Sequence, residues 1–247
     1  MTEPSQERVA ELAANLAAVR ASIADACGVA GRDPAAVRLI AVTKTFPVPD
    51  ILALASLGVT DVGENKDQEA APKAAACAAA GVALRWHFVG QLQVNKAASV
   101  ARYAYLVHSV DRPRLVTALG RRASEAGRVV RCLIQVNLDP DAPGGQAGLQ
   151  PGRGGAAPGD VLDLAAQIAA TDGLELAGVM GVAPLGEPAR PAFARLREVA
   201  AQVRSGYPQA QVISAGMSGD LGEAIAEGAT DVRIGTALLG GRRAFVR

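Results

Sequence analysis

Apolar and polar positions follow two different spacings along the chain. Segments with apolar residues three or four positions apart predict amphipathic helices, and short apolar runs predict buried strands. The helical spacing first occurs near the start of the chain, at Val9, Leu12, Leu16, Val19 and Ile23. It predicts a helix from about Ser5 to Cys27, which Gly28 and Gly31 end.

Beyond this helix, apolar runs and helical segments alternate. The first run ends at Lys44, and the later runs lie at 59–62, 86–89, 104–107, 129–137, 174–180, 211–214 and 231–234. The helical segments between them lie at 49–57, 67–80, 95–102, 112–126, 160–170, 190–205 and 219–227. This alternation predicts one α/β domain over residues 1–247, a closed (β/α)8 TIM barrel with an extra N-terminal helix. An open doubly wound sheet is the competing topology.

The segment from Asp139 to Gly159 does not fit the alternation. It is rich in Gly, Pro and Ala, has almost no large apolar side chain, and is longer than an ordinary connection between a strand and a helix. We interpret it as a mobile surface loop. Because it follows the C-terminal end of a predicted strand, a lid over the active-site end of the barrel is the alternative to disorder without function.

The composition argues against several classes of protein. The 25 basic and 24 acidic side chains give a net charge of +1, which provides no broad field for nucleic acid or an anionic membrane. The N-terminal residues lack the regions of a signal peptide, and the apolar window at 74–84 is too short to span a bilayer. Cys27, Cys77 and Cys132 are far apart, which indicates neither a disulfide framework nor a metal site. We therefore expect a cytoplasmic protein.

Lys44 lies where the first apolar run meets a loop, because Phe46-Pro47-Val48-Pro49 interrupts regular structure directly afterwards. Burial at such a position would disfavour the ammonium form and lower the pKa of the amine. A neutral lysine amine attacks an aldehyde to form a Schiff base. The alternative is a lysine that extends into solvent.

In a barrel of this type, the active site is formed at the C-terminal ends of the strands. The polar residues at the predicted ends are Lys44, Glu64, Asn65, Gln91, Asn95, Lys96, His108, Ser109, Asn137, Ser214, Ser218, Arg233 and Thr236. After the last two strands, Ser218, Gly235 and Thr236 combine hydroxyls, a small residue and helix N-termini, which is the composition of a phosphate site. An ordinary tight turn is the alternative.

Arg233 is the second cation near this predicted site. If it faces a pyridine nitrogen, its permanent charge keeps that nitrogen unprotonated. The alternative is a solvated arginine or one in an ion pair with Asp231. His87 and His108 are expected to be hydrogen-bonded structural residues rather than general bases. Glu64 could be an acid or base, or equally a helix cap or a member of an ion pair.

Several motifs together indicate a family. They are Val42-Thr43-Lys44, Val62-Gly63-Glu64-Asn65 with Gln68-Glu69, Trp86-His87-Phe88-Val89-Gly90-Gln91-Leu92-Gln93-Val94-Asn95-Lys96, His108-Ser109-Val110-Asp111-Arg112, Gly216-Met217-Ser218-Gly219-Asp220, and Val232-Arg233-Ile234-Gly235-Thr236 with Leu239-Gly240. With these motifs, the chain from Arg38 onward closely resembles the pyridoxal-phosphate homeostasis protein family. The resemblance implies a barrel like the N-terminal domain of alanine racemases, with pyridoxal 5′-phosphate (PLP) held as an internal aldimine.

The resemblance also implies roles for individual residues. Lys44 resembles the Schiff-base lysine of the family, and Arg233 resembles the residue that faces the ring nitrogen. The residues that resemble phosphate contacts are Ser218, Gly235 and Thr236. The residues that resemble ring-side neighbours are Asn65, Ser214 and Met217. Lys96 is similar to a family lysine with an auxiliary role.

One family motif is displaced in this chain. The Lys- or Arg-Gly/Ser-Gly motif expected after the fifth strand appears as Arg153-Gly154-Gly155, behind an inserted glycine-rich run. Ala147-Gly148 is an alternative match for the same element. The contacts that this motif makes in the family are therefore not carried over here.

The resemblance favours a protein that binds PLP and delivers it without catalytic turnover, with PLP-dependent apo-enzymes as candidate acceptors and a monomer as the expected state. The first alternative is a small PLP-dependent amino-acid racemase or decarboxylase. Racemisation needs acid/base groups on both faces of the cofactor. About a dozen residues follow the last predicted strand and no tyrosine lies near a strand end, which argues against it. A barrel enzyme that uses Lys44 on a sugar phosphate without a cofactor is the third hypothesis.

Overall fold

The structure is a computed structural model that describes residues 4–139 and 154–241. In these residues, parallel strands pair in sequence order and the last strand pairs with the first, which closes a barrel. The strands are β1 (Arg38–Val42), β2 (Asp61–Glu64), β3 (Arg85–Phe88), β4 (Ala104–Val110), β5 (Val130–Gln135), β6 (Leu174–Met180), β7 (Val212–Ser214) and β8 (Asp231–Ile234). The predicted TIM barrel is confirmed, and the open sheet is excluded.

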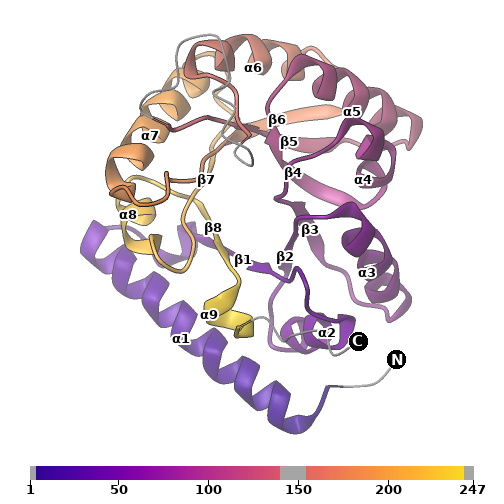
Figure 1. Cartoon of the computed structure of the whole chain (residues 1–247), viewed down its shortest axis with the longest axis vertical. Coiled ribbons are helices and arrows are strands. Elements are labelled where there is room, and N and C mark those ends of the chain that lie inside the picture. Colours follow the sequence, from indigo (N-terminus) through magenta and orange to yellow (C-terminus); the bar gives the residue numbers. More distant parts are fainter. Residues whose placement is uncertain (1–3, 140–153, 242–247) are drawn as a thin grey trace.

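Helices surround the ring of strands, as Figure 1 shows. The extra N-terminal helix is α1 (Gln6–Ala30). The helices that follow the strands are α2 (Val48–Ser56), α3 (Asp67–Ala79), α4 (Ala97–Tyr103), α5 (Pro113–Glu125), α6 (Val161–Ala169), α7 (Ala189–Gly206), α8 (Leu221–Ala226) and α9 (Thr236–Leu239). Short 3-10 turns lie at Pro34–Ala36, Val94–Lys96 and Pro158–Asp160. Each connection returns the chain to the same end of the barrel, so the segments after the strands meet around one opening.

Two elements extend three residues beyond their predicted ends. α1 does not end at Gly28 but continues to Ala30 and ends at Gly31, whose φ of 63° places it in the left-handed region. A glycine within a helix weakens it without stopping it, whereas a residue that must turn left-handed ends it. β4 continues to Val110, so His108 and Ser109 lie within the strand rather than after it, and both are buried.

The predicted loop from Asp139 to Gly159 is described only at its two ends. Ala156 pairs with Val136 in a parallel bridge, in which Asn137 N donates to Ala156 O at 2.9 Å and Ala156 N donates to Gln135 O at 2.8 Å. Residues 155–157 are buried, so the prediction of a mobile surface loop is wrong for this part. Arg153 and Ala147-Gly148 lie outside the described residues, and so does any lid between 140 and 153.

The interior of the barrel is partly apolar and partly polar. An apolar cluster of Leu106, Leu133, Ala177 and Met180 comes from β4, β5 and β6. Buried polar side chains from β2, β3, β4, β7 and β8 share this interior, namely Asp61, His87, His108, Ser214 and Arg233. Barrel interiors are usually filled by branched apolar side chains, and polar groups at this depth need hydrogen-bond partners. The polar set therefore marks a region with a role beyond packing.

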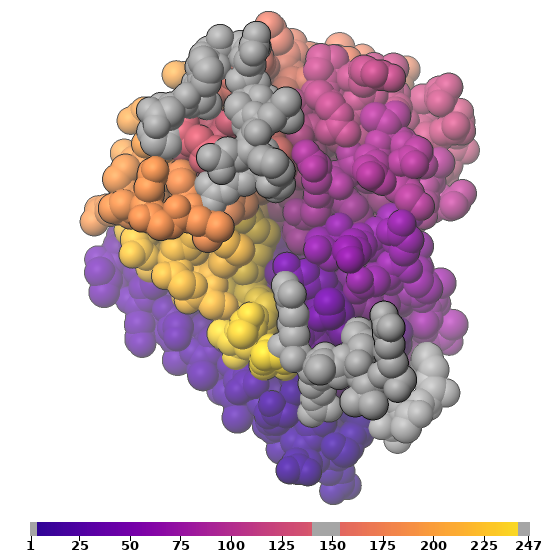
Figure 2. All heavy atoms as spheres, viewed as in Figure 1, coloured from indigo at the N-terminus to yellow at the C-terminus, as the bar shows by residue number. Residues whose placement is uncertain are grey.

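α1 packs along the outside of the barrel against α2, α8 and α9 (Figures 1 and 2). Its apolar side is buried, and two polar side chains join it to the end of the described chain. Arg8 Nη2 donates to Leu239 O at 2.9 Å, and Asn15 Nδ2 donates to Leu238 O at 3.1 Å. Among the described helices, α1 alone has the length and composition to cross a membrane, which core helices of soluble proteins also have.

Ser5→Ala is expected to lower the free energy of unfolding by about 1 kcal/mol, because Ser5 caps α1. Its side chain accepts a hydrogen bond from Arg8 N at 3.2 Å. Urea unfolding followed by circular dichroism measures the change. Ser22→Ala is the matched control, since Ser22 Oγ bonds only to Ala18 O on the exposed face of the same helix. Equal losses in the two variants would contradict the capping role.

Candidate cofactor-binding site

A pocket of about 490 Å³ lies at the C-terminal end of the barrel. It is lined by segments that follow β1, β2, β3, β6, β7 and β8, and by residues from the return at Gly154. Of the predicted site residues, those that line it are Lys44, Asn65, Met217, Ser218, Arg233, Gly235 and Thr236. Ser214 does not line it, but lies beneath it in contact with Arg233. The fold thus brings most of the predicted site residues together around one opening.

Lys44 stands two residues beyond the end of β1, as predicted, and is half-buried rather than fully desolvated. The turn that carries it is held on both sides. Thr45 has a φ of 69°, which a residue with a branched side chain rarely adopts, and Thr45 N donates to Glu69 Oε2 at 2.9 Å. On the other side, Thr43 O accepts a hydrogen bond from Lys73 Nζ at 3.0 Å. The backbone around Lys44 is therefore fixed by side chains of α3.

Lys73 and Glu64 form a buried ion pair beneath this turn. Lys73 Nζ lies 2.8 Å from Glu64 Oε1, and Thr43 Oγ1 donates to the same oxygen at 2.6 Å. Burial raises the pKa of Glu64, whose side chain is 1% exposed and whose Oε2 has no hydrogen-bond partner among the described residues. Glu64 is thus in an ion pair, one of the roles left open by the sequence. Lys73 was missed, although its four-residue spacing from Glu69 was a signal.

Arg233 enters the pocket from β8 and is 5% exposed. It donates to Ser214 Oγ at 2.6 Å and to Gly181 O at 3.0 Å. Burial lowers the pKa of Arg233 to about 10, so the guanidinium stays charged at neutral pH. The suggested ion pair with Asp231 is wrong, because Asp231 Oδ2 accepts from Arg38 Nη1 at 3.3 Å instead. Arg233 thus offers the pocket a cation held by neutral acceptors.

The loops after β7 and β8 form the far side of the pocket. Ser218, Gly235 and Thr236 line it, and Thr236 begins α9, whose first N–H groups have no partner within the helix. Gly216 has a φ of 89°, and a Cβ there would lie 2.6 Å from Ala224 Cβ. A side chain at Gly216 would therefore push the Ser218 loop away from α8. The small residues and hydroxyls suit an anion such as phosphate.

Among the other lining residues, Gln91 was expected as a polar residue at a strand end but given no role, and the rest were not predicted as site residues. The rest are Val42, Val89, Gly90, Gln135, Gly154, Met180, Val182 and Gly219. Gly90 allows the backbone of Asn65 to come close. A Cβ at Gly90 would lie 2.1 Å from Asn65 O, so only glycine fits at this position. Lys96 lines a neighbouring pocket of about 580 Å³, which shares Asn65 and Gln91 with the first. The structure thus separates Lys96 from the pocket that contains Lys44.

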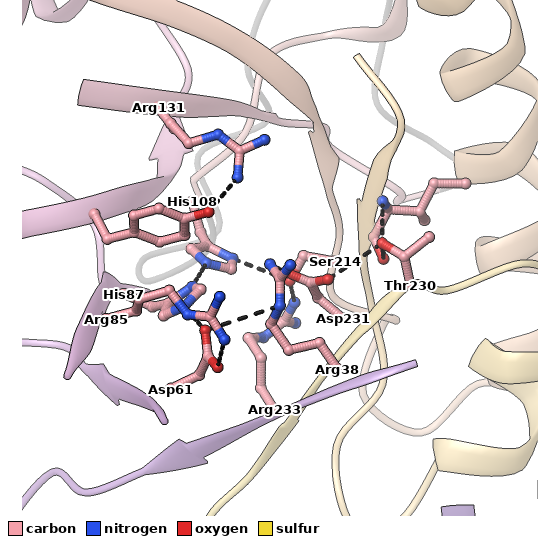
Figure 3. A network of polar contacts seen from close by, with 12 residues as sticks. Arg38, Asp61, Arg85, His87, His108, Arg131, Ser214, Thr230, Asp231 and Arg233 are labelled. Atoms are coloured by element: carbon pink, nitrogen blue, oxygen red, sulfur yellow. Dashed lines mark hydrogen bonds and ion pairs between the residues drawn. The ribbon is translucent and has the colours of Figure 1, made fainter. Parts of the chain in front are cut away.

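Beneath Arg233, buried polar side chains continue through the barrel (Figure 3). Ser214 Oγ lies 3.0 Å from His108 Nδ1, and His108 Nε2 lies 2.9 Å from His87 Nδ1. His87 Nε2 lies 2.9 Å from Asp61 Oδ1. Burial holds the pKa of His108 well below its ordinary value, so the ring is neutral. Both histidines are hydrogen-bonded structural residues, as the sequence led us to expect.

Protonation of Asp61 should make the protein less stable in acid. Burial acts to raise its pKa, but hydrogen bonds from His87, Arg85 and Thr60 outweigh burial and lower it to about 2. Its stabilisation is therefore complete above the ordinary value and is lost as the pH falls toward 2. A shift of this size corresponds to about 2 kcal/mol. Urea unfolding between neutral pH and pH 3 should show a smaller loss in Asp61→Asn than in wild type, and parallel losses would contradict this assignment.

Comparison with known proteins identifies the relatives of this chain. Residues 12–243 match the family described as Alanine racemase, N-terminal domain. A protein from Mycobacterium tuberculosis (strain ATCC 25618 / H37Rv), named Pyridoxal phosphate homeostasis protein, is 43% identical, over 96% of this chain and 95% of its own length. The match thus extends over nearly the whole of both chains.

Solved structures give the same result. PipY of Synechococcus elongatus PCC7942, solved without PLP, is 34% identical with a TM-score of 0.79, over 93% of this chain and all of PipY. PipY with PLP bound has a TM-score of 0.78. Alanine racemase from Corynebacterium glutamicum, at 17% identity and a TM-score of 0.67, shares the fold over 93% of this chain and 60% of the racemase. The 43% identity to the Mycobacterium tuberculosis protein, together with the family match over residues 12–243 and the closed barrel, shows that this chain belongs to the pyridoxal phosphate homeostasis protein family.

Proposed function

We propose that this protein binds PLP in the pocket at the C-terminal end of the barrel, holds it as a Schiff base on Lys44, and serves the homeostasis and delivery of PLP. The observation that carries the proposal is that Lys44, Arg233 and the Ser218 and Thr236 loops line one pocket. An amine, a cation and an anion cradle are the groups that a phosphorylated pyridine aldehyde requires. The PLP-bound structure of PipY supports the same ligand.

The residues fit PLP group by group. Bound PLP supplies an aldehyde that reacts with amines and a ring that withdraws electrons. The Lys44 amine is the covalent anchor, and α3 fixes the turn that presents it. Arg233 faces the ring nitrogen, which it keeps unprotonated because its own proton is not released at neutral pH. Ser218, Gly235 and Thr236 hold the phosphate, while Asn65 and Met217 lie beside the ring and Ser214 fixes Arg233.

The pocket favours storage and delivery over turnover. Among its described lining residues, Lys44 and Arg233 are the ionisable side chains. Racemisation needs a second acid/base group on the opposite face of the cofactor, and no described tyrosine lines the pocket. Tyr103, for example, bonds to Asp67 outside it, with Oη 3.4 Å from Oδ1. A racemase or decarboxylase is therefore the second candidate function.

The proposal includes the setting in which the protein acts. We infer that it is a cytoplasmic monomer that passes PLP to PLP-dependent apo-enzymes. The half-buried position of Lys44 supports exchange with other amines, since a fully enclosed lysine would be out of reach. The buried thiols of Cys27, Cys77 and Cys132 and the packing of α1 on the barrel accord with that compartment.

Titration of the purified protein with PLP tests the proposal. We expect the visible absorption band of a Schiff base, and borohydride reduction followed by peptide mapping should place the modification on Lys44. The spectrum of free PLP throughout the titration would reject PLP binding and favour the sugar-phosphate hypothesis. Exchange of the α-hydrogen of added alanine with solvent deuterium would instead support the racemase, and its absence supports delivery.

A further inference from the structure

A chain of buried polar side chains joins Arg233 to the opposite end of the barrel. It passes from Arg233 through Ser214, His108 and His87 to Asp61, with each contact between 2.6 and 3.0 Å (Figure 3). Its members come from β8, β7, β4, β3 and β2, so no single strand provides it. Packing does not require such a chain, because apolar side chains fill the other part of the interior.

Asp61 sets the direction of the hydrogen bonds in this chain. It carries a negative charge at neutral pH, so Asp61 Oδ1 accepts a hydrogen bond from His87 Nε2–H. We assign a single proton to His87, so its Nδ1 is bare and accepts a hydrogen bond from His108 Nε2. His108 in turn has a bare Nδ1, which accepts a hydrogen bond from the hydroxyl group of Ser214. With both rings neutral, no other order satisfies every contact.

This order determines what Ser214 offers to Arg233. The Ser214 proton is directed to His108, so the lone pairs of Ser214 Oγ are left for Arg233 Nη1. Hydrogen bonds aligned in one direction polarise one another, which increases the negative charge on the last acceptor. Within the described residues no carboxylate is in contact with Arg233, and the chain therefore replaces one.

We propose that His108 and His87 are positioning residues for Arg233: they transmit the polarity of Asp61 to Ser214 and so hold the guanidinium toward the pocket. The inference rests on the proposed function, since it concerns the cation that faces the PLP ring. Asp61 also lines a hollow of about 500 Å³ at the opposite end of the barrel, together with Arg38 and Arg85. The charge that orders the chain is thus supplied outside the cofactor pocket.

NMR of the two histidine rings tests the order directly in the wild-type protein, with or without PLP. We expect both rings to carry their proton on Nε2, since each Nδ1 is an acceptor. A proton on Nδ1 of either ring would overturn the inference without affecting the proposed function. Failure of the protein to bind PLP would reject the function, while the ring spectra would still report the order.

Asp61→Asn tests whether the order matters for binding. An asparagine amide donates as well as accepts, so the rings should lose their single protonation pattern. The dissociation constant for PLP should rise about tenfold, the scale of one hydrogen bond to a charged group. His108→Asn, which keeps a polar group toward Ser214 but breaks the link to His87, should weaken binding in the same direction.

Arg85→Gln is the matched control. Arg85 Nη2 also contacts Asp61, at 2.6 Å, but it lies outside the chain. Its loss should leave the ring protons and the affinity for PLP as in wild type. If Asp61→Asn changes the ring protons but not the affinity for PLP, the positioning role is rejected.

Discussion

Lys44→Ala is expected to abolish covalent uptake of PLP. Among the described residues that line the pocket, Lys44 provides the one amine, so its removal leaves PLP with phosphate and ring contacts alone. The visible band should disappear from the titration, and borohydride should leave no modified peptide. Weak binding of the free aldehyde through Arg233 and the phosphate loops should remain, and equilibrium dialysis measures it.

Lys66→Ala is the matched control for this loss. Lys66 lies near the same opening but lines the neighbouring pocket with Lys96 rather than the pocket with Lys44. The variant should form the Schiff base as wild type does. A full visible band in Lys44→Ala, or its loss in Lys66→Ala, would move the covalent anchor to another lysine and contradict the assignment.

Lys73→Met is expected to lower the free energy of unfolding at neutral pH by about 3 kcal/mol, because it leaves the Glu64 carboxylate buried without its cation. It should also loosen the turn that carries Lys44, since the bond from Lys73 Nζ to Thr43 O is lost. Urea unfolding measures the first effect. The rate of Schiff-base formation with PLP measures the second.

The pH dependence of this loss follows from Glu64. Burial already raises the pKa of Glu64, and without Lys73 the neutral form is favoured further. A carboxyl whose pKa is raised by folding stabilises less as the pH rises through its ordinary value. The loss of unfolding free energy in Lys73→Met, relative to wild type, should therefore be smaller in acid. The double variant Glu64→Gln/Lys73→Met should recover part of the stability at neutral pH, and a double variant as unstable as the single one would reject the ion pair as the cause.

The elements that the sequence predicts best are those fixed by local signals. β6 and β8 match their predicted ranges. β6 is a mostly apolar run that follows Gly173, and in β8 the apolar residues alternate with Asp231 and Arg233 before Gly235. β4 is longer than predicted because His108 and Ser109 are polar and so end the apolar run in the sequence. His108 is buried because Ser214 and His87, on other strands, provide its partners. No local pattern contains that information.

The same distinction applies to the site. Lys44, Ser218, Arg233 and Thr236 could be found because a barrel places the ends of its strands together. Lys73 could not, since its role depends on the side of α3 that faces Glu64. The spacing of Lys73 from Glu69 indicates an ion pair on a helix but not whether it is buried. Contacts between side chains of different elements need the folded arrangement.

The contacts of α1 bear on how the protein is made. Arg8 and Asn15 bond to the carbonyls of Leu239 and Leu238, which the ribosome adds more than two hundred residues later. α8 and α9, which cover the same helix, are also synthesised late. α1 therefore waits with much of its apolar side uncovered until α8 and α9 have been synthesised. During that time its apolar side is accessible to a chaperone, and the barrel can close only after β8 has been synthesised, because β8 pairs with β1.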